Sequence, residues 1–589
     1  MSQFALEATA YLMACCFLFV GLVGAARWAE QNGADRTDAM CFATIYLGTA
    51  ALIIFFAYLP GKVPGLLVTG SGVAFSFWLV HRTRGRAMCD IRPFFIAALF
   101  GLCYISLEHI YVPPDMTGVP GQVFFEQTRP DDDWIPFNFA RAVLENLPSR
   151  TGIDSTGWYF SDRPPLQTGF TLAFAPLREI LPFESVYRAV GTLLQVSALA
   201  AVSLFCQAIG FSRKETDSCV IALGCSGFVF YNSVYCWPKL LAAAFCLIGI
   251  IPLARALVKN ARITLADGIL TGSSFALAML SHGGVGFTFV TMAVLAPVLL
   301  WRKTLSTRGI AAGALVFVAL LSPWQIYSTF VDPNDGKLIK MHLSAGPWDG
   351  KEKPSLMLSK SYSEISFDRW LSNRWQNLLT LFGNDELDGA ILATAKGVGG
   401  DNKGAVPSYP GDSALNGQSL KYDAISMAML LRVDQREHVM RALGLWALAL
   451  PLVLLAIAFT RWRRRIGSAI LGLGVFILVN VAVWICLEFS AGYAVITHAS
   501  LAMIVLAFVF LVSATSRLSR TLSTILLTLN GLASVLVWAI IMPGTLLLPK
   551  SEIQPAPVLM AAISATLLAV VFLRRSAGCV NDQVVAKSR

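Results

Sequence analysis

The sequence predicts an all-α polytopic membrane protein, a bundle of about fifteen transmembrane helices with two long extracytoplasmic loops. Hydrophobic residues make up 56% of the 589 residues and charged residues only 14%, whereas a soluble protein carries roughly 25% charged residues. The mean hydropathy is +0.62, and many apolar runs are close to the ~20 residues that cross a hydrocarbon core. This composition excludes soluble multidomain proteins, disordered chains, fibrous proteins and small disulfide scaffolds.

Neither the net charge of +10 nor the twelve cysteines points to a different class. Lys and Arg gather in short segments between apolar runs, as the positive-inside rule expects, so no nucleic-acid partner is predicted. Most cysteines lie inside apolar runs as small hydrophobic residues, and no Cys-x-x-Cys pair occurs, so no metal site is indicated. The first apolar run is expected to be a retained span and not a cleaved signal.

The apolar runs follow one another with mostly short connections. We predict spans at about residues 5–26, 40–59, 65–80, 93–110, 187–210, 218–235, 239–257, 267–281, 284–300, 309–328, 440–460, 466–489, 496–513, 521–546 and 557–573. The most basic connections between the predicted spans are 81–86 and 461–465. Arg302, Arg517 and Arg574 lie in connections that fall on the same side of the membrane as these two. Placing all of them in the cytoplasm puts the N-terminus outside and the C-terminus inside.

This topology divides the chain into four parts. They are N-terminal helices at 1–92, a central region at 93–330 that includes the first outer loop at 111–186, an extracytoplasmic segment at 331–438, and C-terminal helices at 439–589.

The extracytoplasmic segment contains one amphipathic pattern at 367–382. Six apolar residues fall near one helical stripe there: Trp370, Leu371, Trp375, Leu378, Leu379 and Phe382. The pattern predicts a helix lying on the outer leaflet, or else the core helix of a small extracytoplasmic subdomain.

Three consecutive carboxylates, Asp131, Asp132 and Asp133, stand in the first outer loop just before a helix that starts near Pro136. Adjacent carboxylates repel one another unless a cation, a hydrogen-bond donor or water compensates them. They are therefore either solvated residues that cap the helix, or a general base or divalent-cation ligand at the outer membrane surface.

Further along this loop, Arg163 precedes Pro164 and Pro165 and then an apolar helix. Because proline restricts the residue before it to extended backbone, Arg163 is expected to have little conformational freedom. Its planar guanidinium suits a phosphate group. The alternative is an arginine that pairs with Asp162 or reaches lipid headgroups.

The order of these motifs resembles the GT-C membrane glycosyltransferases, above all the branch with the lipid A aminoarabinose transferases and protein O-mannosyltransferases (glycosyltransferase family 39-like). Residues 131–141 resemble that branch's acidic motif, with Asp132 at its leading Asp and Asp133 at its Glu. Residues 163–166, Arg-Pro-Pro-Leu, resemble its Lys-Pro-Pro-Leu motif. The similarity covers about residues 93–330, which would then form a GT-C-like catalytic core.

The chain departs from the family pattern in three ways. Three apolar spans precede the motifs where one is expected, and arginine replaces lysine before the proline pair. The second acidic position is missing, since residues 236–239 read Cys-Trp-Pro-Lys. Lys239 stands at this point of the sequence instead and is a candidate ligand of the donor phosphate.

The resemblance implies an inverting glycosyltransferase that moves a sugar from a polyprenyl-phosphate donor to a lipid, glycan or protein acceptor. Phosphate is already a good leaving group, so fixed positive charge is needed more than a general acid. Arg163 and Lys239 are the expected ligands of the donor phosphate, and Arg188 is a third candidate that also could simply anchor its span.

Among the carboxylates, Asp132 is the expected base for the acceptor hydroxyl. Asp131 or Asp133 would orient it or help to hold a divalent cation, and no other cofactor is expected. The protein is expected in a bacterial inner membrane, in contact with membrane lipids, with its active site facing the periplasm.

His282, Glu488 and His498 are secondary candidates for binding substrate. His282 stands in an outer turn whose two glycines allow close backbone approach. Glu488 and His498 flank another outer turn. Each has a purely structural alternative.

Two other functions stay open, a transporter or flippase for a lipid-linked sugar and a ligase or polymerase of lipid-linked oligosaccharide. A transporter typically has charges and broken helices near mid-membrane, often in paired halves. Here the charged residues lie mainly at span ends. A ligase or polymerase would not need both the acidic run and the Arg-Pro-Pro motif. The transferase hypothesis predicts that Asp132 and Arg163 meet at one outward-facing site.

Overall fold

The computed structural model of the chain describes residues 2–84, 90–112, 131–147, 159–259, 261–302, 306–333, 336–344, 352–379, 381, 442–489, 501–536 and 552–573. Within these residues the fold is helical apart from one pair of two-residue strands. The prediction of an all-α chain with many long apolar helices is therefore confirmed.

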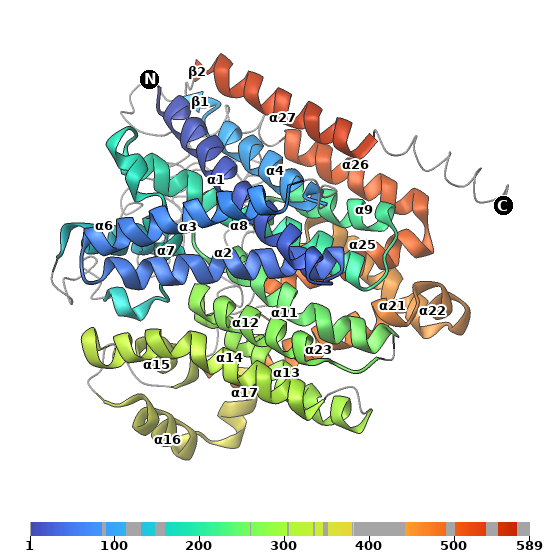
Figure 1. Cartoon of the computed structure of the whole chain (residues 1–589). Coiled ribbons are helices and arrows are strands. Elements are labelled where there is room, and N and C mark those ends of the chain that lie inside the picture. The colour runs from blue at the N-terminus through green and yellow to red at the C-terminus, as the bar shows by residue number, and fades with distance from the viewer. Residues whose placement is uncertain are drawn as a thin grey trace, which may run out of the picture.

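The elements are labelled in chain order (Figure 1). In the first half the helices are α1 (Gln3–Gln31), α2 (Arg36–Tyr58), α3 (Lys62–Arg82), α4 (Arg92–Glu108), α6 (Ile135–Glu145), α7 (Leu166–Ala173), α8 (Phe183–Ala208), α9 (Arg213–Gly224), α10 (Gly227–Val234), α11 (Lys239–Lys259) and α12 (Leu265–Ser281). In the second half they are α13 (Gly286–Trp301), α14 (Thr307–Ile326), α15 (Lys337–Leu343), α16 (Pro354–Glu364), α17 (Phe367–Leu379), α21 (Leu450–Ala458), α22 (Thr460–Ile466), α23 (Ser468–Leu487), α25 (Leu501–Leu518), α26 (Arg520–Leu536) and α27 (Pro555–Leu573). The short 3₁₀ and π turns are η1 (Asp131–Trp134), η2 (Phe160–Asp162), η3 (Ala175–Glu179), η4 (Gly283–Val285), η5 (Tyr327–Val331) and η6 (Gly444–Ala449). The strands β1 (Tyr111–Val112) and β2 (Glu552–Ile553) pair antiparallel.

The predicted number of about fifteen spans is not confirmed. In the described residues nine helices are long and apolar enough to cross a membrane, or eleven if each of two bent pairs is one span. The predicted span at 218–235 is bent by 61° between α9 and α10, because the Ser226 side chain caps a new helix there. The span at 440–460 is followed by a 118° bend into the arginine-rich α22. The predicted span at 521–546 lies only partly within the described residues.

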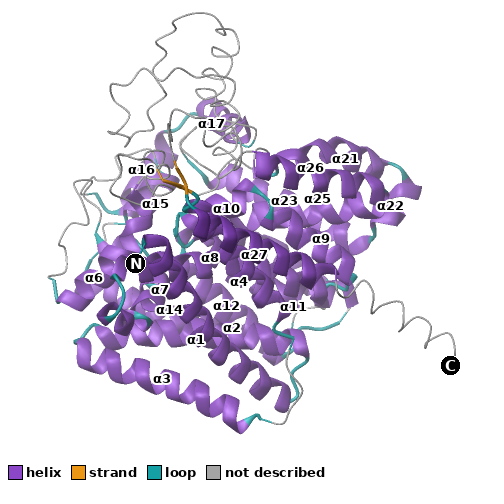
Figure 2. Cartoon of the chain, turned by 90° about the horizontal axis from the view of Figure 1, so that it is seen from above, coloured by secondary structure: helices purple, strands orange, loops and turns teal. Residues whose placement is uncertain are grey.

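The two ends of the helical bundle carry different groups. Both views place α6 and the strand pair toward one end and α22 at the other (Figures 1 and 2). Ion pairs tie the segments at the α22 end together: Arg255 binds Asp38 at 2.9 Å and Asp267 at 2.8 Å, and Arg517 binds Glu215 at 2.6 Å. The turn η1, α7, the start of α8 and α11 and the residue after α12 meet at the opposite end.

Glycines bring α12 and α14 into backbone contact. A Cβ atom on Gly268 would lie 2.0 Å from the Gly309 carbonyl oxygen, and one on Gly272 would lie 2.1 Å from that of Gly313. Both glycine pairs are four residues apart, a spacing that lets two helix backbones approach closely. This contact sets the position of α12, whose C-terminal end is followed by His282.

α17 agrees with the helix predicted at 367–382 and reveals how its faces are turned. Its exposed large apolar side chains follow each other every four residues: Phe367, Leu371, Trp375 and Leu379. Its buried polar side binds the end of α23, where Arg374 Nη1 donates to the Cys486 carbonyl at 2.6 Å and Asn377 Nδ2 donates to that of Glu488 at 2.9 Å. Apolar residues turned outward favour a helix on a lipid surface over the core of a subdomain.

Candidate functional site

The acidic run forms the turn η1, which packs on the start of α8. The backbone of this turn is described, whereas the side chains of Asp131 and Asp132 lie outside what the structure describes. The Asp133 side chain is buried, and the backbone carbonyl oxygen of Asp133 accepts a hydrogen bond from the Tyr187 hydroxyl. The Trp134 ring stacks on Tyr187, with their centroids 6.2 Å apart.

Arg188 lies among carboxylates. Its Nη1 is 3.8 Å from Glu108 Oε1 and its Nε is 3.7 Å from Glu184 Oε1. The charges of Glu108, Glu7 and Asp133 act on it, and its guanidinium lies 5.0 Å from the Trp134 ring centre. These neighbours favour Arg188 as the counter-charge of the acidic side of the site over its expected role as a phosphate ligand.

His109 lies next to these carboxylates and pairs with Glu7 of α1. Its Nε2 lies 2.9 Å from Glu7 Oε2, and both side chains are buried. Burial disfavours the charged imidazole, but the hydrogen bond and the charge of Glu7 outweigh it and raise the pKa of His109 above its usual value.

Arg163 has the extended backbone expected before proline, with φ −123° and ψ 138°. It is buried, with 8% of its surface exposed. The preceding turn is anchored through Asp162, whose Oδ2 accepts from Lys337 Nζ at 3.0 Å and from the Tyr159 amide at 2.8 Å. The Ser161 amide donates to Asp332 Oδ2 at 3.2 Å. The segment after α14 therefore holds Arg163 in place.

A chain of buried hydrogen bonds joins the acidic turn to the helices that carry the cations. Gln167, on α7, donates to the Tyr187 hydroxyl at 3.2 Å, and Tyr187 donates to Asp133. Gln195 donates to Gln167 Oε1 at 3.0 Å and accepts from the Leu241 amide, at the start of α11, at 3.0 Å. We did not predict this chain, although a glutamine within an apolar run is a signal because burying it is costly.

Lys239 and His282 meet near Trp237. Lys239 is buried, with its Nζ 3.6 Å from the Trp237 ring centre, and the His282 ring stands edge-on to Trp237 at 5.6 Å. Burial, together with the charges of Lys239, Arg163 and His342, holds the pKa of His282 well below its usual value.

The neutral His282 ring has a defined proton position. Its Nδ1 accepts a hydrogen bond from the Gly284 amide at 3.1 Å, so the proton of the neutral imidazole lies on Nε2. His282 therefore serves as a hydrogen-bond donor at neutral pH and is a poor base.

Glu488 is buried at the end of α23, and its Oε1 lies 3.2 Å from His342 Nδ1 on α15. His498 lies outside the described residues, so its predicted role stays a prediction. Lys337 and Lys340, also on α15, are buried beside this region and were not among the predicted site residues. Nothing in the local sequence marks Lys337, because its partner Asp162 lies 175 positions away in the chain.

The predicted divalent-cation site stays a prediction. Within the described part of the chain, no group of three or more His, Cys, Asp or Glu side chains is placed to hold a metal ion. The side chains of Asp131 and Asp132, the two carboxylates that would complete such a group with Asp133, are outside that part.

No protein family, curated protein or solved structure matches the chain. The similarity to the GT-C transferases therefore rests on sequence motifs alone. The geometry adds that buried hydrogen bonds join the acidic turn to α7, which follows Arg163, and to the start of α11, which carries Lys239.

Proposed function

We propose that the chain is an integral-membrane glycosyltransferase that transfers a sugar from a polyprenyl-phosphate donor to a lipid, glycan or protein acceptor. The observation that carries this proposal is the chain of buried hydrogen bonds that runs from the acidic turn to α7, just after Arg163, and on to the start of α11. There Lys239 and His282 both lie against Trp237. Fixed cations beside carboxylates suit a reaction that releases a phosphate and deprotonates a hydroxyl.

In the proposed reaction, Arg163 and Lys239 bind the donor phosphate and stabilise the negative charge that gathers on it as the bond to the sugar breaks. His282 adds a neutral hydrogen-bond donor from Nε2. Asp132 removes the proton of the acceptor hydroxyl, which attacks the anomeric carbon from the opposite face. Polyprenyl phosphate leaves with both electrons of the broken bond, and the anomeric configuration inverts.

The charge at the two ends of the bundle supports an extracytoplasmic site. The far end carries Arg302 and the arginines of α22, which the positive-inside rule assigns to the cytoplasm. The site would then face the periplasm of a bacterial inner membrane. A GT-C-like core at 93–330 between flanking transmembrane regions is compatible with this arrangement.

The rival functions differ in what they release. A flippase moves a lipid-linked sugar intact, and a ligase or polymerase transfers a whole oligosaccharide. The ion pairs Arg255–Asp38, Arg188–Glu108 and Lys337–Asp162 lie at helix ends or in connections, which supports an enzyme with a surface site over a transporter with charges at mid-membrane.

The test uses the purified full chain in micelles with polyprenyl-phosphate donors that carry radiolabelled hexoses or pentoses. Labelled transfer to lipid, glycan or protein acceptors is followed together with release of polyprenyl phosphate. Asp132→Asn should lower turnover about 10²–10⁴-fold, and Arg163→Met should also lower it. Glu145→Gln, an exposed carboxylate on α6, is the matched control. Unchanged turnover in Asp132→Asn would exclude Asp132 as the base, and intact donor crossing the membrane without release would favour a flippase.

A further inference from the structure

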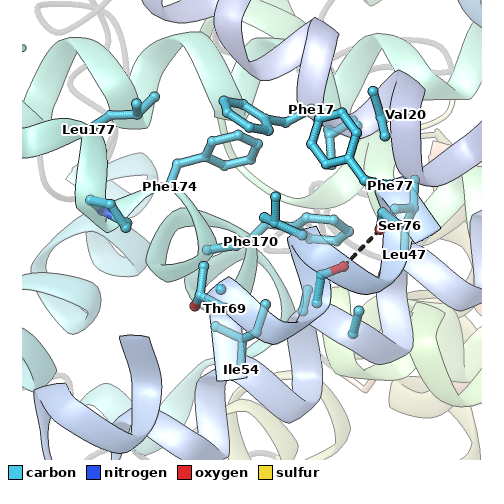
Figure 3. A pocket seen from close by; sticks show the side chains of 18 of the residues that line it. Phe17, Val20, Leu47, Ile54, Thr69, Ser76, Phe77, Phe170, Phe174 and Leu177 are labelled. Carbon is cyan, nitrogen blue, oxygen red and sulfur yellow. Dashed lines mark hydrogen bonds between the residues drawn. The ribbon is translucent and has the colours of Figure 1, made fainter. Parts of the chain in front are cut away.

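Two cavities in the described part of the bundle differ in the charge of their walls. The larger, of about 370 Å³, lies between α1, α2, α3 and α7 (Figure 3). The Tyr46 and Ser76 hydroxyls in its wall bond each other at 3.2 Å, and none of its described lining residues is charged. Its wall therefore gives no basis for selecting one hydrocarbon over another.

The second cavity, of about 210 Å³, has a charged opening at the α22 end of the bundle. It lies between the last turns of α8 and α11, the residue after α13, and the start of α23. Arg302 and Ser468 line it and are exposed, whereas its other described lining residues are apolar or glycine. Leu257 in its wall is 41% exposed, and Leu253 and Phe476 are buried. The cavity therefore runs from a polar opening to a buried apolar floor.

The cavity exists because α23 stays with α13 at one end and parts from it at the other. Asn480 Nδ2 of α23 donates to Thr288 Oγ1, in the first turn of α13, at 3.1 Å. Toward α22, α13 packs on α11 instead, where Leu299 and Leu253 share an apolar cluster. On the α23 side of the cavity, a Cβ atom on Gly472 would meet nothing within 4 Å. Space is thus left between α11 and the start of α23.

The depth of the cavity suits an acyl chain. Ser468 and Phe476 are eight residues apart in α23, so the cavity extends about 12 Å along this helix. One leaflet of a bilayer has roughly 15 Å of hydrocarbon. A lipid with its head group at Arg302 would therefore have much of one chain inside the cavity.

Arginines are concentrated around the opening. Residues 459–470 contain four arginines and no Asp or Glu, and the four side chains, all on α22, are exposed. Arg465 lies three residues before Ser468, which is at most about 10 Å of chain. Trp301, next to Arg302, is 82% exposed, as is typical of tryptophan at the level of lipid head groups.

The carboxylates at this end of the bundle have arginine partners elsewhere. Glu215 binds Arg517 at 2.6 Å, and Asp38 and Asp267 bind Arg255 at 2.9 and 2.8 Å. These ion pairs leave the charge around the opening strongly positive. An anionic group is therefore the complementary ligand.

We propose that this cavity binds one acyl chain of an anionic phospholipid, with the lipid phosphate at Arg302 and the arginines of α22. The ammonium group of a zwitterionic head group would lie among these guanidinium groups and cancel the attraction, whereas phosphatidylglycerol has only hydroxyls there. The bound lipid would join α13 to α22 and α23 where the helices part. This proposal does not depend on the proposed function, because the cavity lies at the opposite end of the bundle from the candidate site.

The labelling experiment uses the full chain in phosphatidylcholine nanodiscs. The probes are phosphatidylglycerol and, in a second arm, phosphatidylethanolamine, each with a photoreactive diazirine in one acyl chain and at the same mole fraction. Mass spectrometry maps the labelled residues. Phosphatidylglycerol should label Leu257 and Phe476 at least fivefold more than phosphatidylethanolamine does. Ile310, exposed at the start of α14, measures the general enrichment of anionic lipid and should show a smaller ratio. Equal labelling of the cavity by the two lipids would overturn the proposal.

Charge variants test the head group. Arg302→Gln should lower labelling of the cavity by phosphatidylglycerol about fivefold, and Arg302→Lys, which keeps the charge, should stay within twofold of the wild type. The matched control is Arg308→Gln, an exposed arginine that does not line the cavity, and it should label as the wild type does. Wild-type labelling in both Arg302→Gln and the triple variant Arg463→Gln/Arg464→Gln/Arg465→Gln would overturn the proposal.

Filling variants test the acyl chain. Gly472→Phe should fill the cavity from the α23 side, where a Cβ meets open space, and Ala254→Phe should fill it from α11. Both should lower labelling of Leu257 by phosphatidylglycerol at least tenfold. Leu478→Phe, an exposed residue of α23 that does not line the cavity, is the matched control and should leave labelling unchanged. Wild-type labelling in both filling variants would show that the chain lies elsewhere and would overturn the proposal.

Discussion

The ion pair between Lys337 and Asp162 should be a main anchor of the turn that holds Arg163. The two side chains are 5% and 1% exposed and 3.0 Å apart. Lys337→Met would leave the Asp162 carboxylate buried with its charge poorly compensated, which costs about 3–5 kcal/mol of unfolding free energy. Adding Asp162→Asn removes that charge, so the double variant should be about 1–3 kcal/mol more stable than the sum of the single effects predicts.

The assay is reversible unfolding in mixed dodecylmaltoside–SDS micelles, followed by near-UV circular dichroism, for all four members of the cycle. The exposed pair Arg141–Glu145, at 3.3 Å and 56% and 46% exposed, gives a matched cycle. Its coupling should be only about 0.2–0.5 kcal/mol. If the coupling energy between Lys337 and Asp162 is no larger than that of the exposed pair, the buried pair does not anchor the site.

Three further predictions concern other parts of the fold. Gly272→Leu should unfold at a lower SDS concentration than the wild type, because the leucine side chain would meet the backbone of α14. Gly531→Leu is the control, since its side chain would point into open space, and it should unfold at the wild-type SDS concentration. Equal unfolding midpoints for the two variants would contradict the prediction. Arg374→Met should lose about 1–3 kcal/mol, since the carbonyl groups at the end of α23 lose a donor, and an unchanged unfolding free energy would show that they are otherwise satisfied. Between about pH 4.5 and 6.5 the His109–Glu7 pair should stabilise the fold fully. This contribution should fade as the pH rises through the raised pKa of His109, and also in acid, where Glu7 becomes protonated. Unfolding curves of His109→Gln with the same pH dependence as the wild type would exclude this.

The parts of the structure that follow from local chemistry were predictable from the sequence. Apolar runs at about residues 40–59 and 466–489 became α2 and α23, because a helix satisfies every backbone polar group in an apolar environment. The extended backbone at Arg163 followed from the proline after it. The stripe at 367–382 predicted α17, though not that its polar side would bind the end of α23.

Contacts between distant segments carry no periodic signal, and these were missed. Lys337 and Asp332 reach a turn about 170 residues earlier in the chain. The backbone contact of α12 with α14 depends on glycines in two separate helices, each of which looks ordinary alone. The Asp132 side chain, central to the predicted chemistry, lies outside the described residues, so its role depends on the transfer assay.

The outward-facing aromatic and aliphatic side of α17 has a consequence for how the molecule adapts to bilayers of different thickness. Because Arg374 ties this helix to the end of α23, its Trp375 would mark a fixed depth at the water–lipid boundary. Hydrophobic mismatch would then be absorbed at the arginine-rich end, where long side chains can reach outward. The proposed phosphate ligands would keep a constant height above the hydrocarbon in thin and thick membranes alike.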